Sequence, residues 1–118
     1  MNRPITSILG RGVSVDAGCV IAGFSRIGDF VRIGRCVSFG HHSEVGAYST
    51  IHPGAVVSGN THIGPRTIIG SGATLIDGIS VGEAAVVAAG SVVTRDVPPR
   101  ALVAGNPAVV KRENDGPR

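Results

Sequence analysis

The stretch from residue 39 to residue 60 gathers side chains that could carry out acid–base chemistry. It contains three of the chain's four histidines, His41, His42 and His52, and it ends in Gly59 and Asn60. An exposed imidazole accepts a proton near neutral pH and can therefore act as a general base toward a hydroxyl or an amine. A glycine beside it can offer a backbone N–H that no side chain covers, which suits the oxyanion formed during acyl transfer. These residue types favour acyl transfer if the fold brings a histidine and a glycine together.

An uninterrupted six-residue repeat must position these residues. Fifteen large apolar side chains occur at intervals of six: Leu9, Val15, Ile21, Ile27, Ile33, Phe39, Val45, Ile51, Val57, Ile63, Ile69, Leu75, Val81, Val87 and Val93. We call this the first position of each hexad and number the others from two to six. The fifth position is mostly small or β-branched, and in an extended strand it faces the same side as the next first position. The second position is glycine in eight of the fifteen hexads. We interpret it as the corner of the chain, because glycine adopts turn dihedral angles at little cost.

The period of six predicts a parallel β-helix. It is too short for an α-helical repeat, and it fits neither a heptad nor a 3.6-residue stripe. Three short strands would close one triangular coil of eighteen residues, and residues eighteen apart would stack at about 4.7–4.9 Å, the spacing of neighbouring strands. Residues 9–98 form fifteen hexads and hence five coils. This register predicts that His41 and Gly59 share one corner, and that Asn60 stacks over His42.

Hexads such as IGDFVR (27–32), IGRCVS (33–38) and VGAYST (45–50) resemble those of the hexapeptide-repeat acyltransferases, and the resemblance extends over residues 9–112. It implies an all-β, single-domain, left-handed parallel β-helix of about five coils with a short C-terminal extension. The left hand is an exception to the general preference of parallel crossovers for the right hand. The resemblance also implies a homotrimer with active sites between subunits, and the aliphatic side chains expected on the flat outer faces fit such an assembly.

The second half of the chain looks like the sugar O- and N-acetyltransferase branch of that family, whose members acetylate sialic acids or amino-sugar nucleotides. The matching segments are HHSEVGAYSTIHPGAVVSGNTHIG (41–64) and VVAAGSVVTRDVPPRALVAGNPA (86–108). The resemblance implies direct transfer of an acetyl group from acetyl-CoA to a hydroxyl or an amine of a sugar or sugar-like molecule. It puts His41 at the position of the catalytic histidine and Gly59 at that of the thioester-binding glycine. His42 stands where the family usually has Asp or Glu, so the group that orients His41 is left open.

Further site residues are expected around this pair. His42 and Asn60 are candidates to orient the base, and His52 is a candidate to face the acceptor, although a plain corner role fits His52 as well. Sugar-nucleotide acetyltransferases of this branch usually carry an N-terminal nucleotide-sugar domain, but the chain shows no G-x-G-x-x-G motif and no βαβ pattern. The resemblance thus leaves three alternatives: the acceptor is not a nucleotide sugar, another chain presents it, or the chain is a fragment. The identity of the acceptor and the choice between O- and N-acetylation stay open. The family's acetyl-CoA-binding segments correspond to small residues that leave room for the pantetheine arm: Ala88, Ala89, Gly90, Gly105, Asn106 and Pro107. Two basic residues, Lys111 and Arg112, could meet the CoA phosphates.

Two other functions are compatible with the same scaffold. A γ-class-like zinc carbonic anhydrase needs three imidazoles around one metal ion. The four histidines occupy four different hexad positions and would not stack, so no metal site is expected. A non-catalytic trimeric β-helix would only assemble, and it would not bind CoA.

The repeat also divides the chain into a lead-in over residues 1–8, the β-helix over 9–98, a capping segment over 99–112 and a tail over 113–118. Pro98 and Pro99 end the repeat, because proline cannot extend a strand ladder. Residues 109–112 fit either a brief strand or one helical turn, and we expect the tail to be disordered.

Composition and charge set the expected environment. The net charge of +3 and the basic C-terminal quarter fit a partner that carries phosphates, but the few aromatic residues and the lack of a nucleic-acid-binding motif argue against a nucleic acid. Cys19 and Cys36 form no CxxC pair, no apolar run is long enough to span a membrane, and the first residues lack a signal-peptide core. We therefore expect a cytoplasmic protein with no membrane partner.

Overall fold

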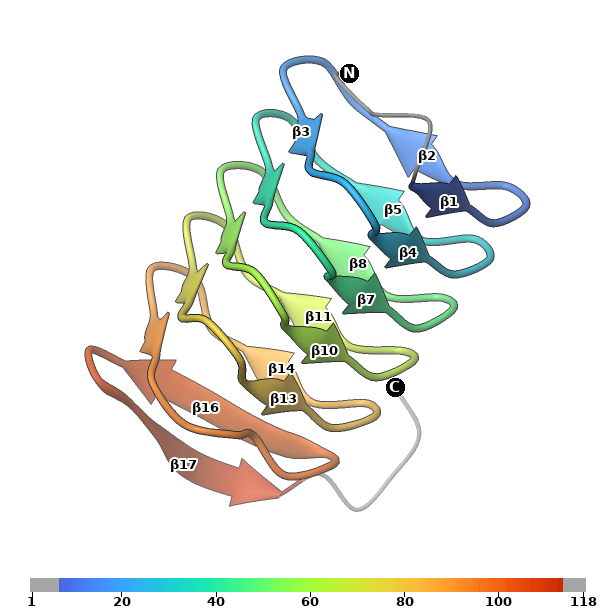
Figure 1. Cartoon of the computed structure of the whole chain (residues 1–118). Coiled ribbons are helices and arrows are strands. Elements are labelled where there is room, and N and C mark those ends of the chain that lie inside the picture. Colours follow the sequence, from blue (N-terminus) through green and yellow to red (C-terminus); the bar gives the residue numbers. More distant parts are fainter. Residues whose placement is uncertain (1–6, 114–118) are drawn as a thin grey trace.

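The fold is that of a β-helix, seen in a computed structural model that describes residues 7–113. Strands β1 to β15 recur every six residues, and each consists of the sixth residue of one hexad and the first residue of the next (Figure 1). Two longer strands follow them at the C-terminal end. The strands are β1 (Ile8–Leu9), β2 (Ser14–Val15), β3 (Val20–Ile21), β4 (Arg26–Ile27), β5 (Arg32–Ile33), β6 (Ser38–Phe39), β7 (Glu44–Val45), β8 (Thr50–Ile51), β9 (Val56–Val57), β10 (His62–Ile63), β11 (Ile68–Ile69), β12 (Thr74–Leu75), β13 (Ser80–Val81), β14 (Val86–Val87), β15 (Val92–Val93), β16 (Ala101–Gly105) and β17 (Ala108–Glu113).

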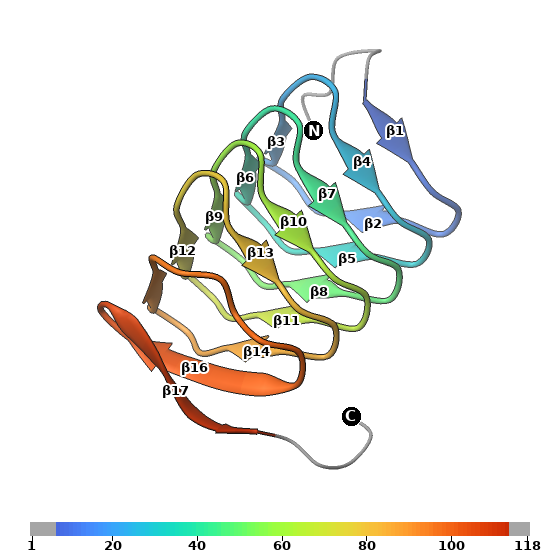
Figure 2. The ribbon, with the colours of Figure 1, turned by 60° about the horizontal axis from the view of Figure 1, so that its bottom comes forward.

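These strands form three sheets that run along the sides of the helix, and every strand pair in them is parallel except that of β16 with β17 (Figure 2). The β1 sheet has the order β1-β4-β7-β10-β13, the β3 sheet has the order β15-β12-β9-β6-β3, and the β2 sheet has the order β17-β16-β14-β11-β8-β5-β2. Paired residues are eighteen apart, as Phe39 and Val57 are. The predicted five-coil, left-handed parallel β-helix is thus confirmed. None of the described residues forms a helix, so no helix in this part of the chain could span a membrane.

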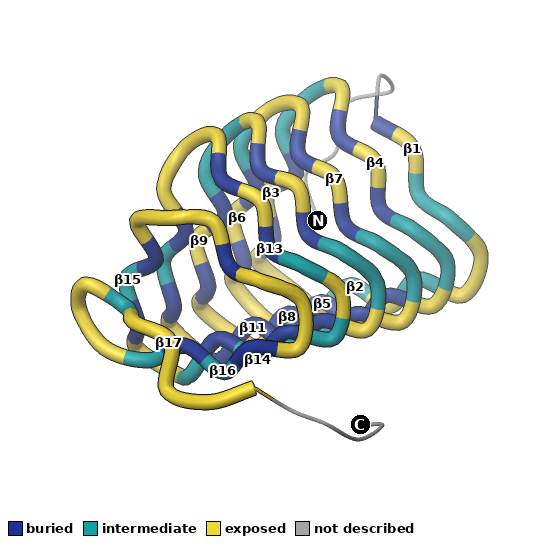
Figure 3. The backbone as a smooth tube through the Cα atoms, turned by 90° about the horizontal axis from the view of Figure 1, so that it is seen from below, coloured by how far each residue is buried: buried dark blue, intermediate teal, exposed yellow. Residues whose placement is uncertain are grey.

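The core is a narrow column of the inward-facing residues that the repeat predicts. Every first-position residue from Ile21 to Val93 is buried, and so is every fifth-position residue from Cys19 to Val97. Buried and exposed residues therefore alternate around each coil (Figure 3). Phe39 is the one buried aromatic side chain among the described residues, so aliphatic side chains fill the rest of the interior.

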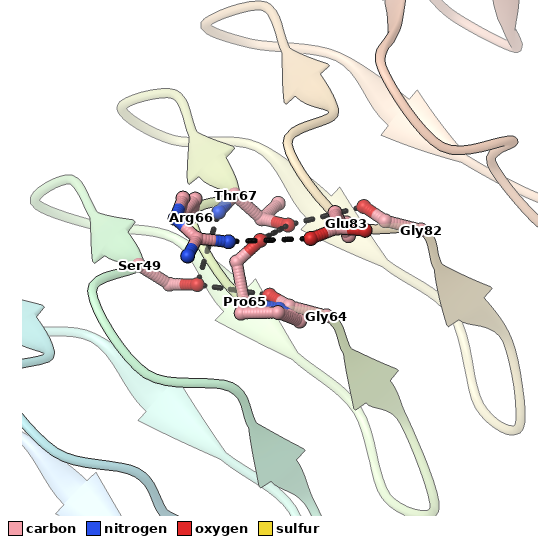
Figure 4. A network of polar contacts seen from close by, with 7 residues as sticks. All are labelled: Ser49, Gly64, Pro65, Arg66, Thr67, Gly82 and Glu83. Atoms are coloured by element: carbon pink, nitrogen blue, oxygen red, sulfur yellow. Dashed lines mark hydrogen bonds and ion pairs between the residues drawn. The ribbon is translucent and has the colours of Figure 1, made fainter. Parts of the chain in front are cut away.

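Hydroxyl groups at the fifth position are buried without losing their hydrogen bonds. Ser43 Oγ donates to the carbonyl of Gly40 at 2.7 Å, and Thr61 Oγ1 donates to that of Ser58 at 2.7 Å. Figure 4 shows a related arrangement, in which Ser49 Oγ donates to the carbonyl of Gly64 at 2.9 Å. A serine or threonine can occupy the core here because a corner carbonyl lies within reach, which removes most of the cost of burying a polar group.

The second-position glycines do not turn the chain, so our interpretation of them was wrong. The left-handed dihedral angles lie at the fourth position, where non-glycine residues such as His42 (φ 58°) and Asn60 (φ 56°) adopt them. The second-position glycine is instead needed for the close approach of the next coil. A Cβ on Gly46 would lie 2.3 Å from the nitrogen of Pro65, and a Cβ on Gly40 would lie 2.4 Å from the nitrogen of Gly59.

This contact predicts which glycines the fold cannot lose. We expect Gly46→Ala to lower the free energy of unfolding by about 1–3 kcal/mol or more, because the new methyl group overlaps backbone atoms. The control is Gly72→Asn at a fourth position, where a Cβ meets nothing within 4 Å and asparagine tolerates the left-handed backbone. It should cost clearly less. Denaturant unfolding measures both variants, and equal losses would contradict the close-approach role.

A hairpin closes the C-terminal end of the helix. Strand β16 pairs in parallel with β14, and β17 then pairs antiparallel with β16. Residues 109–112, for which a brief strand and a helical turn were both considered, belong to β17. The expected lead-in over residues 1–8 and the expected tail over 113–118 lie almost entirely outside the described residues.

Candidate active site

His41 and Gly59 lie at one corner of the helix, one coil apart. This corner, where the chain passes from the β3 sheet to the β1 sheet, is called the β3–β1 corner below. Backbone hydrogen bonds hold its coils in register: Asn60 N–H donates to the carbonyl of His41 at 2.9 Å, and Gly78 N–H donates to that of Gly59 at 3.0 Å. The six-residue register had predicted this stacking, and the structure confirms it.

The His41 imidazole is exposed. Along the axis of the β-helix, no side chain of its own column stands next to it on either side. The residues at the same corner one coil before and one coil after it are Gly23 and Gly59, which have no side chains. The carboxylate of this column belongs to Asp77, two coils beyond His41. Two strand spacings amount to about 9–10 Å, which is beyond hydrogen-bonding distance. No side chain of its own column therefore lies directly against the His41 ring.

Gly59 N–H is available as a hydrogen-bond donor. Among residues 7–113 it donates to no acceptor. Third-position amides are generally unpaired in this part of the chain, and the exception is Arg11 N–H, which donates to Asp29 Oδ1 at 2.9 Å. Gly59 and Gly23 are the third-position residues of this part of the chain that carry no side chain of their own. The Gly59 amide is therefore a candidate hydrogen-bond donor to a bound molecule.

No carboxylate orients His41 within the described part of the chain. Its imidazole makes no hydrogen bond or ion pair there, and its one ring contact is with His42, at a centroid distance of 6.3 Å and an interplanar angle of 83°. Glu44 is the nearest acid in sequence, but its Oε1 lies 3.6 Å from Nδ1 of His62 on the β1 sheet. Glu44 and His62 thus belong to a surface column of polar residues, as the register predicts.

Asn60 stacks over His42 at the β3–β1 corner, as expected, but the structure shows no contact of its side chain with His41. His52 lies at a different corner, where the chain passes from the β2 sheet to the β3 sheet. It is exposed there and lines a shallow recess with Asp16, Arg32 and Thr50. Within one chain, therefore, His52 does not join His41.

The segments expected to bind acetyl-CoA come together, but away from His41. Residues 88–90 form the last turn of the β2–β3 corner, and Asn106 and Pro107 form the β16–β17 hairpin turn, directly after Gly105 at the end of β16. Gly105 N–H donates to Ser91 Oγ at 3.2 Å, so the two segments are neighbours. Lys111 and Arg112 are exposed on β17. Within one chain, these segments and His41 therefore lie at different corners of the β-helix.

The hairpin also creates a groove that the sequence did not reveal. It lies between the last coil and β17, has a volume of about 330 Å³, and is lined by Val93, Val97, Val103, Pro107 and Val110, among others. Only the pairing of β17 with β16 places these residues opposite one another. A strand prediction over residues 109–112, combined with the adjacent turn at 106–107, would have been the signal for it.

Metal-binding side chains do not gather in the described part of the chain. Among residues 7–113, no three His, Cys, Asp or Glu side chains come close enough to hold one metal ion. His41 and His42 are neighbours, whereas His52 and His62 lie on other sides of the helix, as their hexad positions require.

The triangular coil of hexads, with its open histidine–glycine corner, places the chain among the left-handed β-helix proteins. More particularly, the chain belongs to the bacterial transferase hexapeptide (six repeats) family, whose sequence pattern matches residues 24–59 and 60–95. A Staphylococcus aureus protein that carries the name acetyltransferase is 37% identical over 115 residues, which cover 91% of this chain and 55% of that protein.

Two solved structures are similar over nearly the whole chain. The enzyme PerB from Caulobacter crescentus, in complex with CoA and GDP-perosamine, has a TM-score of 0.91 and 36% identity, covering 92% of this chain and 53% of that one. The acetyltransferase domain of PglB from Neisseria gonorrhoeae, in complex with acetyl coenzyme A, has a TM-score of 0.89 and 36% identity, covering 91% and 52%. The chain thus spans about half the length of these relatives.

Proposed function

We propose that this chain is an acetyl-CoA-dependent acetyltransferase that acetylates an amino group of a sugar or sugar nucleotide. The observation that carries the proposal is the β3–β1 corner, where an exposed histidine and a backbone N–H that pairs with no described residue lie one coil apart. A base and an oxyanion donor are the two groups that direct acyl transfer requires. The relatives support the choice of substrates, because they were solved with CoA and GDP-perosamine or with acetyl coenzyme A.

In the proposed mechanism, His41 is the general base. It removes a proton from the amine as the nitrogen forms a bond to the thioester carbonyl carbon. Gly59 N–H donates a hydrogen bond to the carbonyl oxygen as that oxygen becomes negatively charged. When the carbon–sulfur bond breaks, the His41 imidazolium returns the proton to the sulfur of CoA. The transfer is direct, and neither Cys19 nor Cys36 has to act as a nucleophile.

A histidine base also fits the relatives. Two further structures of perosamine N-acetyltransferase carry a substitution of one histidine, to asparagine in one case and to alanine in the other. By analogy, His41 is the residue of this chain whose replacement should be most informative. A base of this kind is typically worth about 10²- to 10⁴-fold in rate.

The proposal includes a homotrimer with sites shared between subunits. His41 lies at the β3–β1 corner, whereas Ala88–Gly90 and the β16–β17 turn lie at the other end of the β3 sheet's strands, at the β2–β3 corner. A second chain that brings its β2–β3 corner against the first chain's His41 would complete the site. His52, at that same corner, is then the histidine placed to face the acceptor, while Ala88, Ala89, Gly90, Asn106 and Pro107 would line the pantetheine arm.

Basic residues on β17 are proposed to bind the phosphates of CoA. We expect the double substitution of Lys111 and Arg112 by serine to raise the KM for acetyl-CoA by up to about thirtyfold, because each exposed charge pair contributes about 1 kcal/mol or less. The kcat should change little, since neither residue is proposed to touch the reacting atoms. Steady-state kinetics at low and high salt measures both constants.

The matched control for this pair is Arg11→Ser. Arg11 is an exposed arginine at the opposite end of the β-helix, where it pairs with Asp29 at 3.7 Å. Its loss should leave the KM for acetyl-CoA unchanged. An equal rise in both variants would show that the overall charge of the protein matters and that β17 holds no specific phosphate site.

A further inference from the structure

The His41 ring has one aromatic neighbour in the described part of the chain, which is His42. The column of His41 offers no packing surface, because Gly23 precedes it and Gly59 follows it one coil away. No described residue forms a hydrogen bond or an ion pair with the imidazole. The remaining contact is the edge-to-face arrangement with His42, at 6.3 Å and 83°. This distance lies within the range of aromatic pairs that prefer T-shaped geometry.

The His42 ring is itself held in place by Phe24, which lies one coil earlier. The two rings stack, with centroids 5.2 Å apart and an interplanar angle of 15°. The backbone N–H of His42 donates to the carbonyl of Gly23 at 3.1 Å, and this hydrogen bond fixes the backbone of the corner. Phe24 occupies the same hexad position one coil earlier and has the same left-handed backbone, with φ 61° against 58° for His42.

The same stacking occurs elsewhere in the fold, so the geometry of the corners produces it. Phe30 and Tyr48 are also fourth-position residues one coil apart, and their rings stack at 5.5 Å and 17° at the β1–β2 corner. Coils repeat at about 4.7–4.9 Å, so aromatic rings that leave successive corners in the same direction must stack face to face. What distinguishes the Phe24–His42 stack is that a histidine stands beside it at the third position.

We propose that Phe24 and His42 are positioning residues for His41: stacking on Phe24 fixes the His42 ring, and the His42 ring fixes the plane of the His41 imidazole. In this role His42 acts by ring packing and not as a hydrogen-bond partner of His41. The inference rests on the proposed function, because it assumes that His41 is the base. The positioning role requires the aromatic ring of His42, but it does not require a proton on that ring.

The other polar groups near the stack do not take over this role. Arg26 and Glu44 line the same shallow groove as Phe24 and His42. The Glu44 carboxylate is engaged by His62 on the β1 sheet. Neither Arg26 nor Glu44 forms a hydrogen bond or an ion pair with His41, so the observed ring contact that can restrict His41 is the one with His42.

The first test measures the mobility of the His41 ring in the free protein. Side-chain ¹³C relaxation of the imidazole should show larger-amplitude motion in His42→Ala than in the wild type, and wild-type order in His42→Phe. Phenylalanine fits this position, because Phe24 and Phe30 already adopt its backbone conformation. Unchanged His41 order in His42→Ala would overturn the proposal. This readout does not depend on catalysis, so it tests the stack even if acetyl transfer fails.

The second test measures transfer kinetics. An aromatic pair contributes about a two- to tenfold shift in equilibrium, so His42→Ala and Phe24→Ala should each lower kcat by about two- to tenfold, without a change in the KM for acetyl-CoA. His42→Phe and Phe24→Tyr should restore the wild-type kcat. Equal losses in His42→Ala and His42→Phe would overturn the proposal, because they would show that the imidazole itself is required.

The control for both tests is Tyr48→Ala. It removes the equivalent ring stack at the β1–β2 corner, which contains no third-position histidine. Neither the order of the His41 ring nor kcat should change in this variant. A loss of either would show that the stacks act through overall stability, and it would overturn a specific effect on His41.

Discussion

His41→Ala is expected to lower the rate of acetyl transfer by about 10²- to 10⁴-fold, the usual contribution of a general base. The side chain is exposed and has Gly23 and Gly59 as its column neighbours, so its removal leaves no cavity in the core. The loss should therefore appear in kcat, with an unchanged thermal unfolding temperature. Steady-state kinetics with acetyl-CoA and an amino-sugar acceptor measures the rate, and circular dichroism checks the fold.

The matched control is His62→Ala. His62 is also an exposed histidine close to His41 in the sequence, but it lies on the β1 sheet and pairs with Glu44. Its loss removes only a weak surface ion pair and should leave the rate unchanged. If both histidine variants retained the wild-type rate, His41 would not be the base and the proposed mechanism would be wrong.

Gly59→Pro is expected to lower the rate by about 10²- to 10³-fold, because it deletes the N–H proposed to stabilise the oxyanion. The fold should tolerate this change. Pro53 and Pro65 already occupy the third position, each facing a second-position glycine one coil earlier, and Gly40 provides the same space opposite Gly59. The unfolding temperature of Gly59→Pro should therefore stay close to that of the wild type while kcat falls.

Gly59→Ala separates the loss of the donor from simple crowding. It keeps the N–H and adds only a Cβ, which would lie 3.3 Å from the carbonyl oxygen of His41. Alanine occurs at the third position elsewhere, as at Ala47. We expect a clearly smaller loss of rate than in Gly59→Pro. Equal losses in the two variants would count against the backbone amide as the oxyanion donor.

The six-residue repeat makes the architecture predictable from the amino-acid sequence. A large apolar residue every six positions determines which side chains point inward, and the register of eighteen then places His41 beside Gly59. The same register places Phe24 beneath His42, since these residues are also eighteen apart. The prediction for His42 considered only Asn60, on its other side, and so it did not include the ring stack.

Other features depend on distances that no periodicity reveals. The role of glycines such as Gly46 was predicted wrongly, because the close approach of consecutive coils is a property of the folded backbone. The groove beneath the hairpin arises only when β17 pairs with β16. The separation of His41 from the expected CoA segments also follows from which corner each occupies, and it is this separation that makes a shared site between chains part of the proposal.

The most direct test of the proposed function is to incubate the purified chain with acetyl-CoA and a panel of amino-sugar acceptors that includes GDP-perosamine, and to follow the products by mass spectrometry. The account predicts that at least one amine gains a single acetyl group. It also predicts that one CoA thiol is released for each acetylated product, and only when the acceptor is present. Thiol release that does not depend on any acceptor, or a failure to bind and consume acetyl-CoA, would contradict it.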